Sequence, residues 1–167
     1  MGEVKFERLE IAKGPQIAEF EKVSKEQYND NATYDNIKLP KRATKGSAGY
    51  DFFLPHDITI NPGENVKVAT GIRCFMDSGY VLQLYPRSGL GFKYGLQLRN
   101  TVGIIDSDYY YALNEGHIIC SLVNTGDIPI ELKAGDAFVQ GVFMPYGITF
   151  DDEVTRVRTG GFGSTSE

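Results

Sequence analysis

Apolar residues in this chain mostly come in short runs that are broken by Gly, Pro, Asn and Asp. Such runs predict β-strands, because they are short for a helix and end at turn-forming residues. Short strands that follow one another at this spacing are typical of an all-β sandwich, jelly roll or barrel. The predicted strands are Val4–Leu9, Ile58–Ile60, Val66–Cys74, Tyr80–Tyr85, His117–Val123, Ile128–Leu132 and Ala137–Met144.

The pattern changes near the start of the chain, where one helix is predicted. Gly14-Pro15 can open this helix, and Asn29-Asp30-Asn31 can end it. Between these two signals, residues at positions 17, 20, 24 and 28 recur at helical spacing. No internal repeat or low-complexity tract interrupts the rest of the chain.

Residues 151–167 differ from everything before them. They have no apolar periodicity, but they contain Arg156, Arg158 and the run Thr159–Thr165, in which three glycines surround one phenylalanine. Free backbone N–H groups, a stacking ring and hydroxyl donors are the parts of a phosphate-binding loop, although the spacing is not that of the Walker motif. A frayed terminus is the alternative interpretation. Fully extended, the segment would reach roughly 55 Å, far enough to cross a subunit boundary.

Length and composition predict one globular domain. Of the 167 residues, 41% are apolar and 23% are charged, and the chain has 17 basic and 22 acidic residues. The net charge of −5 argues against binding to a nucleic-acid backbone. No apolar run is long enough for a membrane span or a signal peptide. Cys74 and Cys120 lack a CxxC spacing, so we expect reduced cysteines in a cytoplasmic protein, without a disulfide or a zinc site.

Several polar residues beside the predicted strands have chemistry of their own. The Asp106 carboxylate is ionised at pH 7 and can accept a proton from water, although Asp-Ser-Asp is also a turn signal. Ser88 can cap a short helix through Phe92 and so direct free N–H groups at an anion. Gln140 alternates with apolar neighbours, and a buried amide needs polar partners. Tyr109 is by default a core aromatic.

Five segments combine glycine with charged or hydroxyl residues. They are Ala48–Asp51, Pro86–Leu90, Gly103–Tyr109, Gly135-Asp136 with Gln140 and Pro145, and Arg158 with Gly160–Thr165. In this order and at these separations they resemble the five motifs of the homotrimeric dUTPase family, over roughly Lys38 to Ser166. The resemblance implies a small β-sandwich subunit of jelly-roll type, with three active sites at subunit interfaces. It also implies that Mg²⁺-bound dUTP is hydrolysed to dUMP and pyrophosphate, which lowers dUTP and supplies dUMP for thymidylate synthesis.

The resemblance assigns catalytic and phosphate-binding roles to matching positions. Asp106 would orient and deprotonate the water that attacks the α-phosphorus. Gln140 would contact phosphate or the catalytic water. Asp51 would act on Mg²⁺ through water, because the ion is held mainly by the substrate phosphates. The triphosphate would be contacted by Arg87, Ser88 and Gly89.

The resemblance also indicates which residues would contact the base and the sugar, and which would form a closing arm. Asn100, Gly103 and Ile105 would surround uracil, with a surface-loop role as the alternative for Asn100. Tyr109 would pack flat against the deoxyribose and leave no room for a 2′-hydroxyl. The domain would span residues 1–150, and residues 151–167 would form a mobile arm that closes a site formed by other subunits. In the arm, Phe162 would stack on uracil, and the γ-phosphate would be held by Arg158, Gly163, Ser164 and Thr165.

The chain departs from the family pattern at three places. Ala137 follows Gly135-Asp136, where the fourth motif usually has Arg. The stretch from Tyr109 to His117 is about four residues longer than the usual third motif, which predicts an extended hairpin. His117 there is either a pH-sensitive site residue or incidental. Residues 12–36 exceed the usual N-terminal region and would form a helical insert. Long third motifs resemble those of dUTPases from Gram-positive bacteria and their phages.

Two other functions compete with dUTP hydrolysis. A dCTP deaminase shares the fold and an Arg-Ser segment, but that family needs a catalytic glutamate and lacks the glycine-rich arm. A phage-type dUTPase that also binds a repressor protein is the second alternative. The long N-terminal stretch and the tyrosine cluster at 109–111 would then be contact surfaces.

Overall fold

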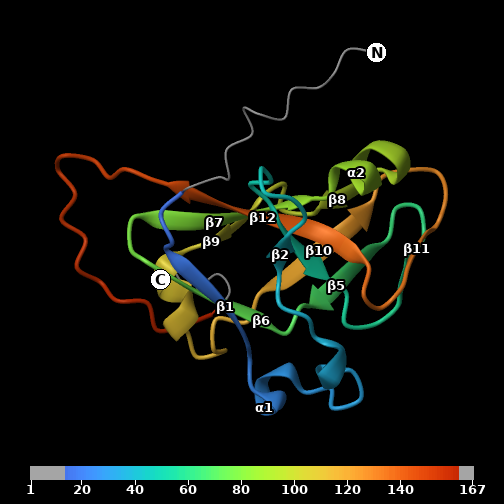
Figure 1. Cartoon of the computed structure of the whole chain (residues 1–167), viewed down its shortest axis with the longest axis horizontal. Helices are drawn as coiled ribbons and strands as arrows, with labels where there is room; N and C mark the ends of the chain where they lie inside the picture. The colour runs from blue at the N-terminus through green and yellow to red at the C-terminus, as the bar shows by residue number, and fades with distance from the viewer. Residues whose placement is uncertain (1–13, 162–167) are drawn as a thin grey trace.

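The computed structural model describes residues 14–161, and within them the chain is built mainly from antiparallel strands (Figure 1). Two short α-helices and two 3-10 turns are also present: α1 (Lys25–Tyr28), α2 (Ser88–Tyr94), η2 (Tyr34–Asn36) and η3 (Ser107–Tyr111). The strands are β1 (Ala18–Lys22), β2 (Lys41–Arg42), β3 (Tyr50–Phe53), β4 (Ile58–Ile60), β5 (Asn65–Ala69), β6 (Ile72–Met76), β7 (Tyr80–Pro86), β8 (Leu96–Leu98), β9 (Gly103–Ile105), β10 (Ile119–Asn124), β11 (Ile130–Leu132) and β12 (Ala137–Pro145).

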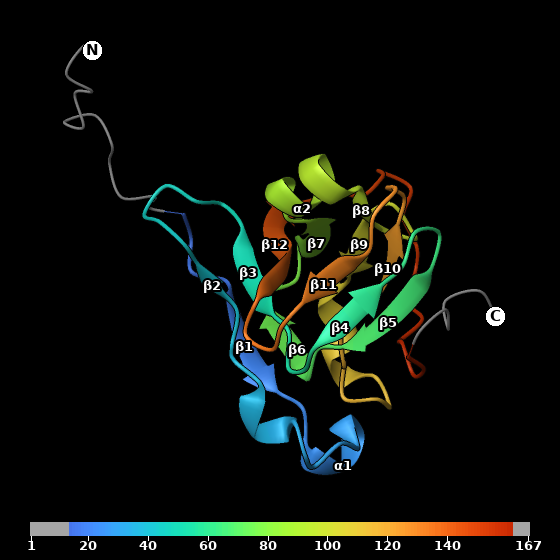
Figure 2. The ribbon, with the colours of Figure 1, turned by 90° about the vertical axis from the view of Figure 1, so that its right-hand side faces the viewer.

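Two larger sheets enclose one hydrophobic core. The first has the order β2-β3-β12-β7-β9, and the second has the order β5-β10-β8; the pairs β1-β6 and β11-β4 complete the arrangement. Figure 2 shows β2 and β3 on one side of the molecule and β4 and β5 on the other. A single core cluster takes side chains from both larger sheets, such as Phe52 and Leu82 from the first and Val68 and Leu122 from the second. This sandwich confirms the predicted all-β fold of jelly-roll type.

Most of the predicted strands are present at the expected places. Strand β4 matches its prediction residue for residue, and β7, β10, β11 and β12 differ from theirs by a few residues at the ends. In β10 every second residue is buried, as the alternating pattern requires. The predicted strand Val66–Cys74 is two strands, because Gly71 turns the chain between β5 and β6 with φ of +73°. The predicted strand Val4–Leu9 lies outside the described residues.

The helix predicted near the start of the chain is largely wrong. Its first half is the strand β1, which pairs antiparallel with β6. The ring of Phe20 in β1 packs against the rings of Tyr50, Phe52 and Phe143, at centroid distances of 5.3 to 5.7 Å. Only α1 is helical, and it ends at Asn29, whose φ is +57°. The edge of β6 and this aromatic cluster therefore override the helical spacing of the sequence.

The predicted extension of a hairpin after Tyr109 is also wrong. Strand β9 pairs with β7 and ends at Ile105, and the chain then enters η3 and a series of turns before β10. Gly116 closes these turns with φ of +71°, and a Cβ there would lie 2.7 Å from the Tyr109 carbonyl oxygen. The extra residues are thus looped out between Tyr109 and a glycine that packs directly against it. Among residues 14–161, no helix is long and apolar enough to span a membrane.

Candidate active site

The first cavity lies where β3, β12 and the start of α2 meet, and we call it the α2 cavity. Its volume is about 340 Å³. Loop residues Ala43–Gly49 contribute to one wall. The α2 cavity brings together every residue that was predicted to contact phosphate or metal in the domain itself: Asp51, Arg87, Ser88, Gly89 and Gln140.

Strand pairing and short polar contacts fix the side chains in the α2 cavity. In the sheet, Gln140 on β12 lies opposite Asp51 on β3 and opposite Tyr85 on β7. The Gln140 Nε2 atom donates a hydrogen bond to the Pro86 carbonyl at 3.3 Å. The Arg87 Nε atom lies 3.3 Å from Asp51 Oδ1. The cavity therefore holds a cationic guanidinium, a carboxylate and an amide whose positions are set by the central strands of the sheet.

The helix that borders this cavity begins differently from the prediction. Ser88 is the first residue of α2, and Arg87, with extended backbone angles, is the N-cap. No side-chain capping hydrogen bond is made there, so the proposed capping role of Ser88 is wrong. The first N–H groups of a helix have no acceptor within it. The Ser88 hydroxyl is consequently not used for capping, and it lines the cavity beside those N–H groups.

The second cavity, of about 410 Å³, lies beside β9 and is mainly apolar; we call it the β9 cavity. Asn100, Gly103 and Ile105 all line it, as the predicted base-binding role requires. Asn100 is exposed on the turn between β8 and β9, so it is both a loop residue and part of the cavity wall. Gly103 allows β9 to approach β7, since a Cβ there would lie 2.9 Å from the Cβ of Leu84.

The third cavity, of about 440 Å³, lies between η3 and the C-terminal segment, and we call it the arm cavity. The chain after β12 runs away from the sheet and returns beside η3 (Figure 1). There the guanidinium of Arg158 donates to two carboxylates: Nη2 lies 2.8 Å from Asp106 Oδ2, and Nε lies 2.8 Å from Asp108 Oδ1. The Arg158 side chain is only 9% exposed, whereas both carboxylates are about half exposed.

Tyr109 lies next to the arm cavity but is itself buried, with 6% of the residue exposed. Its hydroxyl donates to the His117 carbonyl at 2.6 Å and accepts from Asn114 Nδ2 at 2.9 Å. Burial raises the pKa of this phenol, so it is protonated at neutral pH. The centroid of the Tyr109 ring lies 5.8 Å from the guanidinium carbon of Arg158. In this single chain Tyr109 is thus a packed aromatic under the arm.

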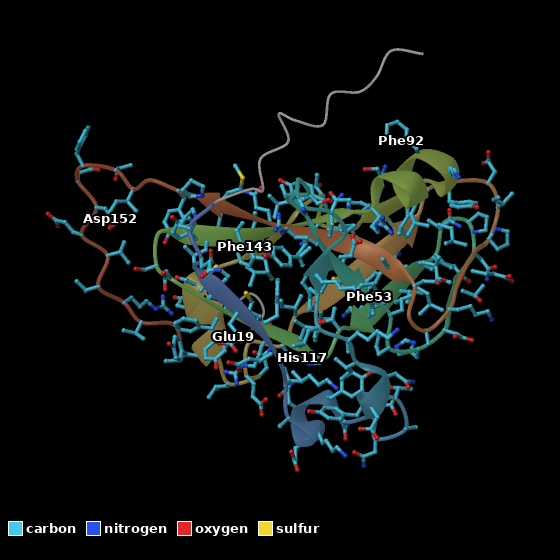
Figure 3. The ribbon with its side chains drawn as sticks, viewed as in Figure 1. Glu19, Phe53, Phe92, His117, Phe143 and Asp152 are labelled. Carbon is cyan, nitrogen blue, oxygen red and sulfur yellow. The ribbon has the colours of Figure 1, made fainter. Side chains whose placement is uncertain are left out.

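His117 is a structural residue rather than a site residue. It is 2% exposed, and its Nε2 atom accepts the Gly71 N–H at 2.9 Å. Nδ1 lies 3.4 Å from Gln27 Nε2. Burial lowers the pKa of this imidazole, which keeps it neutral at pH 7. In Figure 3, His117 lies on the side of the molecule toward α1, away from the labelled Phe92 of α2.

In the described part of the chain, the predicted site residues are distributed over three cavities, apart from Tyr109, which lines none of them. The α2, β9 and arm cavities share no lining residue. Sequence reasoning missed Asn114, which lines the β9 cavity from the extra loop and carried no motif that could have identified it. It also missed the pairing of Arg158 with Asp106 and Asp108. Four predicted residues lie outside the described range: Phe162, Gly163, Ser164 and Thr165.

Comparison with known proteins identifies the family to which this chain belongs. A model of the dUTPase family matches residues 35–166. The chain belongs to the dUTPase family. Over 132 residues it is 44% identical to a deoxyuridine 5′-triphosphate nucleotidohydrolase of Lactococcus lactis, covering 77% of this chain and 88% of that relative. A protein of the same name from Haemophilus influenzae is 36% identical over 146 residues, covering 83% of this chain and 93% of the relative.

Comparison with solved structures supports the same family assignment. The crystal structure of dUTPase from Streptococcus mutans matches with a TM-score of 0.66 and 43% identity, covering 78% of this chain and 97% of that one. A dUTPase from phage phi11 of S. aureus matches with a TM-score of 0.64 at 21% identity, over 83% of this chain and 97% of that one, which is a likeness of fold. The predicted resemblance to the family, including its Gram-positive members, is confirmed.

Proposed function

We propose that this protein hydrolyses dUTP to dUMP and pyrophosphate by attack of water on the α-phosphorus. In the cell this reaction lowers dUTP and supplies dUMP for thymidylate synthesis. The observation that carries the proposal is the α2 cavity, in which a member of the dUTPase family gathers its predicted phosphate-binding groups. Both cysteines are free and buried, and burial raises the pKa of each thiol to about 12, in keeping with a reduced cytoplasmic protein.

The α2 cavity would bind the triphosphate. Arg87 supplies a fixed positive charge, Ser88 supplies a hydroxyl, and the first turn of α2 supplies N–H groups. The amide of Gln140 is held by the Pro86 carbonyl and would contact a phosphate oxygen or the attacking water. These groups carry both charge and hydrogen-bond donors, so they suit an anion that must be held in one orientation.

The same cavity fits a magnesium ion brought in by the substrate. Within residues 14–161, no three His, Cys, Asp or Glu side chains cluster to hold a metal by themselves. Asp51 is a single carboxylate next to anion-binding groups, and Mg²⁺ takes phosphate oxygens and keeps several waters. Asp51 would therefore hold the ion indirectly, through a bound water. When bound, Mg²⁺ neutralises charge on the phosphates.

Asp106 would be the general base. Its carboxylate is half exposed and accepts a hydrogen bond from Arg158. In the site of another copy, a γ-phosphate would offer Arg158 a partner of higher charge, and movement of the arm to that site would free Asp106 Oδ2 of its own chain for water. The remaining arm residues, Phe162 to Thr165, would close over the base and the phosphates.

Uracil would occupy the β9 cavity. Asn100 and the backbone of Gly103 and Ile105 line this cavity, which is otherwise mainly apolar. Such a wall suits a flat base that needs few polar partners along one edge. Tyr109 would face the sugar.

We also propose that three copies assemble into a homotrimer. The α2, β9 and arm cavities have no lining residue in common in one chain, which supports a site completed by residues of different copies. Several large apolar side chains are exposed on α2 and on the C-terminal segment, as expected of a surface that another copy covers. They are Phe92, Ile148, Phe150, Val154 and Val157.

The function is tested by pyrophosphate release from dUTP, dTTP, dCTP and UTP, with and without Mg²⁺. We expect Mg²⁺-dependent release from dUTP alone. The Asp106→Asn variant should bind dUTP normally and lose activity by a factor of about 10² or more. Ammonia release from dCTP would instead identify a deaminase, and near-normal turnover by Asp106→Asn would remove Asp106 from the role of base.

The trimer and the crossing arm are tested by mixing two inactive chains. One chain carries Asp106→Asn and an intact arm, and the other retains Asp106 but ends after Val157. Mixed trimers, purified through two different tags after co-expression, should recover activity, because Asp106 of one chain meets the arm of another. Absence of recovery in mixed trimers would show that each arm serves its own chain. Sedimentation as monomers would contradict the trimer itself.

A further inference from the structure

The loop from Tyr110 to His117 is the part of the third motif that exceeds the family pattern, and Asn114 lies within it. The amide of Asn114 touches three different parts of the candidate site. It bonds to Tyr109, it lines the β9 cavity, and it lies against Gly161 of the C-terminal segment. This longer loop thus places one polar side chain between the predicted sugar-binding, base-binding and arm segments.

The contact with Tyr109 fixes the direction of the ring. The Tyr109 hydroxyl donates to the His117 carbonyl and accepts from Asn114 Nδ2, so it has a partner for its proton and one for its oxygen. The Asn114 amide is oriented in turn, because its Oδ1 accepts the Gly116 N–H at 3.3 Å. A phenol held on both sides cannot swing without breaking a hydrogen bond in a buried place.

The other two contacts connect this hydrogen bond to the ligand. Asn114 stands in the wall of the β9 cavity together with Asn100, Gly103 and Ile105. On the arm side, a Cβ built on Gly161 would lie 3.1 Å from Asn114 Nδ2. The amide therefore lies between the cavity and the backbone of the same chain's C-terminal segment.

We propose that Asn114 is a positioning residue for sugar selection: it holds the Tyr109 ring where a 2′-hydroxyl would otherwise lie. This inference rests on the proposed function, because it assumes that dUTP is the substrate. Without the amide, the Tyr109 oxygen loses one of its two partners, and the ring gains freedom to tilt. A tilted ring leaves space for a ribose, so UTP gains turnover relative to dUTP.

The test compares kcat/KM for dUTP and UTP in four proteins: the wild type, Asn114→Ala, Tyr109→Phe and the double variant. We expect Asn114→Ala to lower the preference for dUTP over UTP about five- to tenfold, the fold-change that corresponds to the net free energy of one hydrogen bond. In the Tyr109→Phe background, which lacks the hydroxyl, Asn114→Ala should change the preference little. This dependence on the hydroxyl separates positioning through Tyr109 from a general structural role.

The control is Leu113→Ala, on the neighbouring residue, which is 86% exposed and should leave the preference unchanged. Asn114→Ser replaces the alanine variant if the latter does not fold by circular dichroism. An unchanged preference in a folded Asn114 variant, or an equal loss with and without the Tyr109 hydroxyl, overturns the inference alone. Failure of the wild type to hydrolyse dUTP overturns the proposed function and, with it, this inference.

Discussion

The position of one amide in the candidate site depends on the absence of a side chain opposite it. A Cβ built on Gly49 would lie 2.3 Å from Gln140 Oε1, which is far inside van der Waals contact. Glycine at this point of the first motif therefore allows the Gln140 amide to reach into the α2 cavity and to bond to the Pro86 carbonyl. The reason for a glycine here is space rather than backbone conformation, since Gly49 does not have a positive φ.

This explanation predicts the effect of Gly49→Ala. The methyl group displaces the end of the Gln140 side chain, which is flexible, so the free energy of unfolding should change little. The amide loses its place in the cavity, and kcat/KM for dUTP should fall by about tenfold or more, as for a displaced hydrogen bond to a charged group. Gly46→Ala is the matched control in the same loop, because nothing lies within 4 Å of its Cβ. Equal activities of the two variants would contradict the spatial argument.

At the scale of elements, two segments that exceed the family pattern pack against each other. Glu115 in the loop after η3 accepts the Ser24 N–H at 2.8 Å and the Ser24 hydroxyl at 2.6 Å. Ser24 also caps α1, because its oxygen accepts the Gln27 N–H. Tyr110 in the same loop donates to Glu21 of β1 at 2.9 Å. The N-terminal segment thus braces the loop that carries Asn114.

We predict that Glu115→Ala weakens the packing of the N-terminal segment against the loop after η3. Removal of two hydrogen bonds to a carboxylate in a partly exposed place should lower the free energy of unfolding by about 1–2 kcal/mol. Urea denaturation measures the change, and Glu131→Ala on the exposed face of β11 is the control. In a double-mutant cycle with Ser24→Ala, the two effects should be far from additive. Additive effects would show that Glu115 and Ser24 stabilise the protein independently.

For the molecule as a whole, the buried imidazole of His117 makes stability depend on pH. Burial lowers its pKa below the usual 6.5, so the unfolded chain binds a proton at a pH where the folded protein does not. Stability therefore rises with pH through this window and is lost as pH falls below 6.5. His117 joins the β5–β6 turn to the loop after η3, so its protonation acts on two segments that are 46 positions apart in the chain.

The prediction is a drop in the urea midpoint between pH 7.5 and pH 5.5 that His117→Gln reduces. The sequence contains two histidines, so NMR can follow both imidazoles separately, and His117 should titrate below 6.5. The same pH dependence in the wild type and in His117→Gln would show that other groups are responsible.

Local sequence determined the strands and the motif loops. Alternation of buried and exposed residues and the turn residues between them located β4, β7, β10, β11 and β12. The resemblance to the family located the predicted phosphate-binding residues of the α2 cavity, and Asn100, Gly103 and Ile105 of the β9 cavity. These features depend on neighbouring residues along the chain, which is why they can be inferred without the fold.

Tertiary structure decided the features that depend on distant partners. Residues 18–22 have helical spacing, but the free edge of β6 and the aromatic cluster around Phe20 make them a strand. The Asn114–Tyr109 bond depends on turns that no motif describes, and the pairing of Arg158 with Asp106 joins residues 52 positions apart. Such contacts cannot be inferred from local sequence, because their interaction energy arises only when the packed elements meet.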